Sequence, residues 1–387
     1  MSTLRKPRVR IYHNNLWARY KGAIFSRIHV ASGRFGLDTE FVQVAETSIE
    51  RAQLGGVDRS YHQYPFKLLF RGSHNDIPRY KLVFALAADV LRNRSELVVI
   101  PGYHKPEYWV MLILCILLRR KRAVFCDSTA YDREKYRWKE RAKFFFFRRC
   151  DGVFCYGTRS REYVASYGVK EQRIITDCQA AALPHAYDAD AVRRHFESKA
   201  SGTASVKFLF IGRLAKEKGL HDLLDAFRRV RDQMPEARLD IVGSGLLADE
   251  LKQRARELGL ESTVAFLGTK SPEDIGLLLL NSDAMVLPSH TEPWGLVVNE
   301  ALSYGCPVVV SNICGCVPEL VREGVTGYSF PMGDVRALCA AMLSAARMSE
   351  DRVSAAERCL QLIGQYTPER AADEFLSGCV LMLKTPQ

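Results

Sequence analysis

Short apolar runs alternate with amphipathic segments along almost the whole chain. In the first half, such runs predict buried strands at Val9–Tyr12, Phe41–Val44, Leu97–Ile100, Ala123–Cys126 and Asp151–Tyr156. The apolar segment Tyr108–Leu118 predicts a helix, and at that length it favours burial against a sheet over a place in lipid. Strand, helix and strand at this spacing form a βαβ unit, so we expect a parallel sheet.

The second half repeats the alternation, with glycine at the ends of its strands. Strands at Lys207–Ile211, Ala284–Ser289 and Pro307–Val310 predict a doubly wound α/β sheet, whose ligands bind beyond the carboxyl ends of the strands. The composition turns to Gly, Ser and Thr at 201–205, which indicates a domain boundary. The expected division is a first domain 1–180, a linker 181–204, a second domain 205–365 and a C-terminal helical segment 366–387.

Length and composition agree with two globular domains. The chain has 387 residues, 47% of them hydrophobic, and is too long for one ordinary core. No apolar run reaches the ~20 residues of a membrane span, and MSTLRKPRVRI continues directly into a strand, so we expect a cytosolic protein. The 11 cysteines lack C-x-x-C spacing, which favours reduced, buried thiols over disulfides or a metal site.

Positive charge is concentrated in the first half. Residues 1–190 carry 33 Lys and Arg against 19 Asp and Glu, so this half is expected to face something anionic. In Lys135–Arg149, one helical face can hold Trp138, Ala142, Phe145 and Phe146, surrounded by Arg137, Lys139, Arg141, Lys143 and Arg148. That pattern suits a helix lying on an anionic membrane. It suits equally a core helix with a solvated basic side.

The segment Ala284–Gly305 joins a strand, a polar elbow and a helix. The helix Gly295–Tyr304 opens at a glycine, and its bare backbone N–H groups form an anion site. Glu292 lies in the elbow, and Glu300 lies on the face of the opening turn. Two carboxylates repel a bare phosphate, so we expect them to hold hydroxyls attached to it. A nucleotide-sugar meets both requirements.

A second element offers cations for the same ligand. The strand Lys207–Ile211 ends at Gly212 and Arg213, and a short loop then brings Lys218. Arginine presents a planar fork of donors to phosphate, whereas lysine presents a mobile point charge. A role as ordinary surface charge is disfavoured by their place at the end of a buried strand.

These two elements resemble family 4 glycosyltransferases, which are retaining enzymes. The likeness rests on Glu292 and Glu300 within SHTEPWGLVVNEALSYGCPVV and on the GRLAKEKG element of Arg213 and Lys218. It implies the GT-B fold, an α/β architecture of two doubly wound, Rossmann-like domains facing a central cleft. The C-terminal helix, predicted at Pro368–Leu383, would then cross back to the first domain.

The resemblance also assigns roles in the second domain. Glu300 would bind the ribose hydroxyls and Glu292 the hydroxyls of the transferred sugar. The diphosphate would lie against Arg213, Lys218 and the start of the helix. The donor-binding candidates are Gly212, Arg213, Lys218, Gly295, Leu296 and Glu300, and Glu292, Arg213 and Lys218 are also catalytic candidates. No cofactor and no metal are then required, because the nucleoside-diphosphate-sugar is the donor substrate.

The first domain departs from the family at two places. Its first strand should end in a double-glycine loop, but the chain has only Gly22, with Lys21 before it. Where relatives often have a histidine after the fifth strand, this chain has Asp127. Asp127 is therefore the candidate for contacting the reacting sugar or acceptor, with His104 next and Lys21 on the possible acceptor side. Asp127 and His104 could instead be satisfied polar residues at strand ends.

Two further segments allow more than one interpretation. Gly55–Pro78 reads as a long loop that shapes an acceptor site or is merely surface. Asp188 and Asp190 match a D-x-D metal motif, but a cap for the helix Ala191–Phe196 is the favoured interpretation.

The function predicted is transfer of a sugar from a nucleoside diphosphate to an acceptor hydroxyl. By the resemblance, the acceptor is a lipid-linked glycan or oligosaccharide of bacterial surface-polysaccharide assembly. The protein would lie peripherally on the inner face of the cytoplasmic membrane. The alternatives are a nucleotide-sugar epimerase of the same fold and a nonenzymatic nucleotide-sugar-binding protein. A nucleic-acid partner is not expected, because the basic residues follow no nucleic-acid-binding module.

Overall fold

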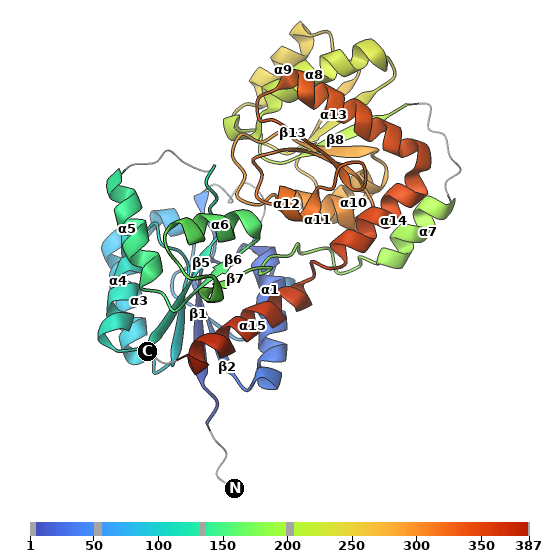
Figure 1. Ribbon diagram of the computed structural model, residues 1–387. Coiled ribbons are helices and arrows are strands. Elements are labelled where there is room, and N and C mark those ends of the chain that lie inside the picture. The colour runs from blue at the N-terminus through green and yellow to red at the C-terminus, as the bar shows by residue number, and fades with distance from the viewer. Residues whose placement is uncertain (1–4, 50–55, 132–136, 199–204, 386–387) are drawn as a thin grey trace. The chain divides into compact units, whose positions relative to one another are not determined.

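The computed structural model describes residues 5–49, 56–131, 137–198 and 205–385 (Figure 1). The chain divides into two compact units. Unit 1 comprises Met1–Ala182 with Thr367–Gln387, and unit 2 comprises Leu183–Tyr366. The C-terminal helix therefore belongs to the unit formed by the start of the chain.

Unit 1 is built on a parallel sheet. Within the described residues the sheet has seven strands in the order β3-β2-β1-β4-β5-β6-β7. The strands are β1 (Arg8–Asn15), β2 (Asp38–Ala45), β3 (Phe66–Leu68), β4 (Leu97–Ile100), β5 (Lys121–Cys126), β6 (Gly152–Cys155) and β7 (Ile174–Ile175). Its helices are α1 (Arg19–Ala31), α3 (Arg79–Arg92), α4 (Pro106–Leu117), α5 (Arg137–Arg148), α6 (Thr158–Ser166) and α15 (Pro368–Lys384).

Two apolar clusters sandwich this sheet. Helices α3, α4, α5 and α6 pack in one cluster, which includes Leu86, Met111 and Phe147. Helices α1 and α15 pack in the other, which includes Phe25 and Phe375. Alternate residues of each strand supply the two faces, as the period of a strand requires.

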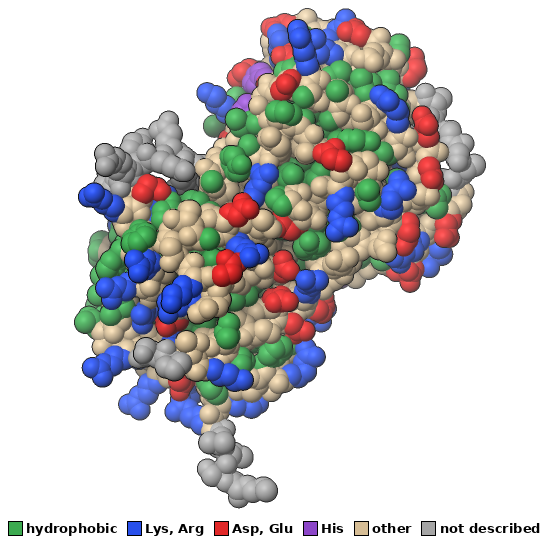
Figure 2. Space-filling view, in the orientation of Figure 1, with side chains coloured by type: hydrophobic (Ala, Val, Ile, Leu, Met, Phe, Trp, Pro, Cys, Tyr) green, Lys and Arg blue, Asp and Glu red, His purple; other side chains and the backbone are tan. Residues whose placement is uncertain are grey.

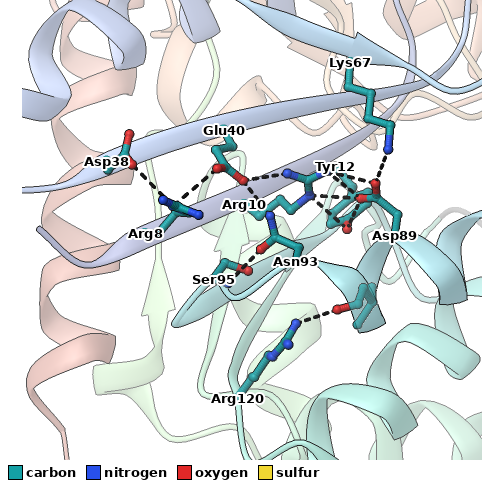
Figure 3. A network of polar contacts seen from close by, with 11 residues as sticks. Arg8, Arg10, Tyr12, Asp38, Glu40, Lys67, Asp89, Asn93, Ser95 and Arg120 are labelled. Atoms are coloured by element: carbon teal, nitrogen blue, oxygen red, sulfur yellow. Dashed lines mark hydrogen bonds and ion pairs between the residues drawn. The ribbon is translucent and has the colours of Figure 1, made fainter. Parts of the chain in front are cut away.

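A polar network ties the start of β1 to α3 (Figure 3). The Arg10 guanidinium donates to both carboxylate oxygens of Asp89 at 2.8–2.9 Å. Tyr12 and Lys67 each donate to Asp89 at 2.6 Å. Burial opposes ionisation of Asp89, but the hydrogen bonds from Lys67 and Tyr12 and the charge of Arg10 hold its pKa below the ordinary value. The network fixes α3 against the sheet, because Asp89 on α3 accepts from residues of β1 and β3.

Unit 2 has the same architecture. Its described residues form a parallel sheet in the order β10-β9-β8-β11-β12-β13. The strands are β8 (Lys207–Ile211), β9 (Arg238–Val242), β10 (Val264–Gly268), β11 (Ala284–Leu287), β12 (Val308–Ser311) and β13 (Gly327–Phe330). The helices are α7 (Ala189–Ser198), α8 (Leu220–Gln233), α9 (Ala248–Glu257), α10 (Pro272–Leu280), α11 (Leu296–Ser303), α12 (Val317–Leu320), α13 (Val335–Met348) and α14 (Arg352–Ile363).

The structure adds to the sequence prediction at three segments. The helix expected at Ala191–Phe196 is present as α7 (Ala189–Ser198), and it packs against α14 within unit 2 instead of lying in a separate linker. The segment Gly55–Pro78, predicted as a loop, also contains β3, which pairs with β2. This strand was not predicted because three residues are too few to show the alternation of a strand. In α5, Phe146 and its neighbour Phe147 are buried, which agrees with the second of the two interpretations, a core helix with a solvated basic side.

The eleven cysteines are buried and none forms a disulfide, as the sequence predicts. Among the described helices, none combines the length and the apolar character needed to cross a membrane.

Candidate functional site

The donor-side candidates gather where the strand order of unit 2 reverses. Strands β8 and β11 are neighbours, although they are far apart in the chain, and the later strands continue outward on both sides of this pair. The loop after β8 carries Arg213 and Lys218, and the elbow after β11 carries Glu292. In open α/β sheets a reversal of this kind leaves a crevice at the carboxyl ends of the two strands, where ligands bind.

The elbow between β11 and α11 depends on one glycine. Gly295 is the residue before the helix and has φ 101°, a conformation that side-chain-bearing residues rarely adopt. The buried Trp294 indole donates to Asn299 Oδ1 at 2.8 Å, which fixes the direction in which the helix begins. The positive end of the α11 dipole is therefore held at this edge of the sheet. Glu300 lies on α11 and is half-buried.

Lys218 and Glu292 come together from opposite sides of the strand pair. The Lys218 ammonium donates to Glu292 Oε2 at 2.5 Å, and both side chains are 15% exposed. The short 3-10 turn Lys216–Lys218 ends at Gly219, whose φ is 65°. A Cβ at Gly219 would collide with the carbonyl oxygen of Pro288, so only glycine lets this loop lie against the elbow.

Arg213 lies on the same loop but is more exposed. Its guanidinium donates to Glu217 Oε1 at 2.8 Å, and the two side chains are 41% and 38% exposed. An exposed pair of this kind contributes little to stability, about 0–1 kcal/mol. The guanidinium can therefore exchange Glu217 for a phosphate oxygen at small cost. Gly212 is held by the hydrogen bond from its N–H to the carbonyl of Val242.

Sequence reasoning missed the residues that hold the elbow in place. The His290 ring lies 2.6 Å from Asp222 Oδ2 on α8, and its backbone N–H donates to the Glu217 carbonyl. From the β12 side, the N–H of Gly315 donates to the carbonyl of Glu292. The position of His290, two residues before Glu292, could have marked it as part of the site. Its partner Asp222 could not be found by spacing, because it lies 68 residues earlier in the chain.

In unit 1, the strand order reverses between β1 and β4. Lys21 lies on α1, just after β1, and is 2% exposed. Its ammonium is 4.7 Å from the ring centroid of Phe125 and 4.8 Å from that of Tyr156. Burial lowers the pKa of Lys21 to about 8, a shift that the charge of Asp127 opposes. The next position must be glycine, because a Cβ at Gly22 would lie 2.9 Å from the His62 ring.

Asp127 and His104 are both exposed at the carboxyl ends of neighbouring strands. Asp127 directly follows β5, and the Tyr103 hydroxyl donates to the adjacent Ser128 at 2.8 Å. The charge of Asp127 acts on Lys21, so the structure brings these two candidates to one edge of the sheet. His104 stands edge-on to the ring of Tyr108, with 5.8 Å between the ring centroids.

Asp188 and Asp190 serve α7. The Asp190 N–H donates to Asp188 Oδ1 at 2.9 Å, the geometry of a helix N-cap. Arg194 pairs with Asp188 at 3.2 Å, and Arg193 pairs with Asp190 at 2.8 Å. The predicted cap is therefore confirmed.

Comparison with known proteins identifies unit 2. Residues 192–359 match the family model described as glycosyl transferases group 1. Glycogen synthase of Mycobacterium tuberculosis is 41% identical over 155 residues, which span 40% of this chain and 37% of that protein. The match thus covers little more than a third of that relative's length. Unit 2 is a glycosyl transferases group 1 domain, and the family resemblance predicted from Glu292 and Glu300 is confirmed.

Solved structures share the fold of the whole chain. The Anabaena protein HepE in complex with UDP has a TM-score of 0.70 at 18% identity, covering 96% of this chain and 99% of that one. The lipopolysaccharide outer core galactosyltransferase WaaB has a TM-score of 0.71 at 16% identity, covering 96% and 98%. These likenesses and the two parallel sheets confirm the two Rossmann-like domains of the predicted GT-B fold.

Proposed function

We propose that this chain, with its glycosyl transferases group 1 domain, moves a sugar from a nucleoside-diphosphate donor to an acceptor hydroxyl with retention of configuration. The observation that carries the proposal is the Lys218–Glu292 pair at the strand-order reversal of unit 2. It sets a cation for phosphate beside a carboxylate for hydroxyls, with the start of α11 in the same elbow. The complex of HepE with UDP supports the choice of donor.

The chemistry asked of unit 2 is stabilisation of a leaving group. The bond between the sugar C1 and the diphosphate oxygen breaks, and C1 forms a bond to the acceptor oxygen. Negative charge grows on the departing diphosphate, which takes the proton of the acceptor hydroxyl. Arg213 and Lys218 interact more strongly with this charge than with the intact donor, so they lower the barrier. One such donor typically contributes ~2.7–4 kcal/mol.

The two glutamates would bind the hydroxyls on either side of the diphosphate. Glu292, beside Lys218, would accept hydrogen bonds from the transferred sugar next to the diphosphate. Glu300, about one turn into α11, would accept those of the ribose. Gly212, Gly295 and Leu296 would let backbone groups approach the phosphates. With cations in place at the diphosphate, the proposed reaction needs no metal.

Unit 1 would supply the acceptor side. Asp127 and His104 are exposed at the carboxyl edge of its sheet and are the groups that can contact an acceptor. Lys21 is buried, so we assign it an indirect role, through its charge on Asp127.

The acceptor proposed is a lipid-linked glycan of surface-polysaccharide assembly, met on the inner face of the cytoplasmic membrane. Two observations support it. Unit 1 carries most of the chain's positive charge, and WaaB, named for its action on the lipopolysaccharide outer core, shares the fold.

A panel of nucleotide-sugars tests the proposal by thermal stabilisation. A true donor at 100 times its dissociation constant adds ~2.7 kcal/mol to stability. Incubation of the stabilising nucleotide-sugar with and without candidate acceptors then separates the activities. Transfer requires the acceptor, whereas an epimerase releases an altered sugar without one. Absence of stabilisation by every nucleotide-sugar would refute the proposal.

A further inference from the structure

The outer surface of α3 and α4 in unit 1 exposes a row of large apolar side chains. The exposed fraction is 73% for Phe84 and for Leu117, large values for residues of this size. We call the following six residues the α3/α4 face: Tyr80, Phe84, Leu91, Ile113, Leu117 and Leu118. The helix containing Ile113 packs against the sheet, as the sequence predicted, and its other side is left exposed.

These residues form one surface because the two helices share a core. Leu82, Leu86 and Val90 of α3 lie in the same buried cluster as Met111 and Cys115 of α4. The two helices also pack directly against each other. Since both turn their inner sides to one cluster, their outer sides point the same way.

Helix α5 extends the surface. The ring of Trp109 on α4 stacks with Phe145 on α5 at 6.2 Å between centroids. Phe144 and Phe145 are 43% and 45% exposed, and the Arg149 guanidinium lies 5.1 Å from the Phe145 ring centroid. In Figure 2, hydrophobic and basic side chains lie side by side over the region of α4 and α5.

The exposed charges on these three helices have one sign, and the nearest exposed carboxylates, Asp76 and Glu96, lie in the segments before and after α3. Helices α3, α4 and α5 contain three carboxylates, and none is left open to solvent without a partner. Asp89 and Glu107 are buried, and Glu140 accepts from Lys143 at 2.8 Å. By contrast, exposed cations stand along the helices and just beyond their ends: Arg79, Lys81, Arg92, Arg94, Arg119, Lys139, Arg141, Arg148 and Arg149.

We propose that the α3/α4 face docks on an anionic lipid bilayer, with its apolar side chains in the interface and its cations on the headgroups. Apolar residues edged with lysine and arginine are the composition of surface-bound helices. The described helices are too short or too polar to cross the bilayer, so the face lies on it.

Charge distinguishes the bilayer from a second copy of this chain. A twofold dimer would place the same patch against itself. The nine cations would then meet nine identical cations without exposed carboxylates on these helices to offset them. A bilayer containing anionic lipid supplies the missing negative charge.

The inference deepens the membrane association proposed above and moves it from α5 to a broader surface. In α5 the expected apolar face included Phe146, which is fully buried. Lys143 pairs with Glu140 and lies 5.5 Å from the Tyr163 ring centroid, so it is engaged within the protein. The side chains of Arg137 and Trp138 lie outside the described part of the chain. The exposed apolar residues of α3 and α4 are therefore the larger contribution.

Co-sedimentation with phosphatidylcholine vesicles, with and without phosphatidylglycerol, tests the apolar part. Wild type should bind only the anionic vesicles, and less at high salt. Phe84→Ser with Leu117→Ser should lower the partition coefficient at least tenfold. Val30→Ser is the matched control, since Val30 is 74% exposed on α1, across the sheet. Equal binding by all variants, or no binding by wild type at low salt, would overturn the proposal.

A second variant tests the charge. Removing three cations with Arg92→Gln, Arg94→Gln and Arg119→Gln should weaken binding to anionic vesicles by roughly a hundredfold. Sedimentation velocity on the same proteins decides the alternative occupant. The face is a dimer interface if the wild-type protein self-associates and does not bind vesicles, while the variant with Phe84→Ser and Leu117→Ser is monomeric. Thermal stabilisation by UDP is measured in parallel. Its absence refutes the proposed function and leaves the vesicle result to be judged separately.

Discussion

Replacing each member of the Lys218–Glu292 pair in turn should shift UDP affinity in opposite directions. The Glu292 carboxylate is 2.5 Å from the ammonium that would bind the diphosphate, so it lies ~5 Å from a phosphate oxygen bound there. At that separation, and at an effective dielectric of ~40, two unit charges repel by ~1.7 kcal/mol. Glu292→Gln removes this repulsion and should tighten UDP binding on the order of tenfold.

Lys218→Met acts in the other direction. It deletes a charge-assisted contact to phosphate and leaves the carboxylate in place, so UDP binding should weaken about a hundredfold. Both variants should slow sugar transfer. Glu292→Gln loses an ionic hydrogen bond to the sugar, worth ~1.5–3 kcal/mol, and Lys218→Met loses leaving-group stabilisation of ~2.7–4 kcal/mol.

Isothermal titration of UDP into wild type and the two variants measures the first effect, and initial rates of transfer measure the second. Lys252→Met on α9 is a matched control, because that lysine is 46% exposed and forms only a 3.6 Å surface pair. It should change UDP affinity less than threefold. If Glu292→Gln weakens UDP binding as much as Lys218→Met does, the carboxylate does not lie beside the diphosphate and the assigned geometry is wrong.

Four other outcomes follow. Glu300→Ala should weaken donor and UDP binding about tenfold with a smaller effect on the rate at saturation, and a change confined to the rate would contradict its ribose role. Transfer should survive EDTA, whereas recovery by Mn²⁺ or Mg²⁺ after chelation would contradict a metal-independent reaction. Gly219→Ala should destabilise unit 2 and reduce UDP binding, because its Cβ meets the Pro288 carbonyl and φ is 65°, and unaltered melting and affinity would contradict this. The pKa of Lys21 is lower in the folded state than in the unfolded state, so burying its charged form lowers the free energy of unfolding by up to ~3 kcal/mol below pH 8, and this destabilisation disappears as the pH rises toward 10.5. The free energy of unfolding of wild type relative to Lys21→Met, measured with urea, should therefore rise between pH 8 and pH 10.5.

Local sequence patterns were enough to predict the two sheets and to select the donor-side candidates. Buried parallel strands are continuous apolar runs, so β4, β5, β8 and β11 are visible without any partner. The donor-side candidates fall in two short elements, from Gly212 to Lys218 and from Glu292 to Glu300. Each element directly follows one buried strand, so the candidates could be selected from local spacing alone.

Tertiary structure decided which side chains meet. Lys218 and Glu292 are 74 residues apart, and only the adjacency of β8 and β11 pairs them. The same holds for His290 with Asp222. The burial of Lys21 depends on rings from β5 and from the loop after β6, so spacing near Lys21 carries no sign of it.

Packing also decided which apolar residues remain in water. Phe144, Phe145, Phe146 and Phe147 are consecutive and chemically identical, yet the last two are buried and the first two are nearly half exposed. In α4 the one charged residue, Glu107, is buried, so no polar stripe marks the outer side of the helix. Only contact with the sheet and with α3 selects the face that is covered, and the remaining face is left to solvent or to a partner.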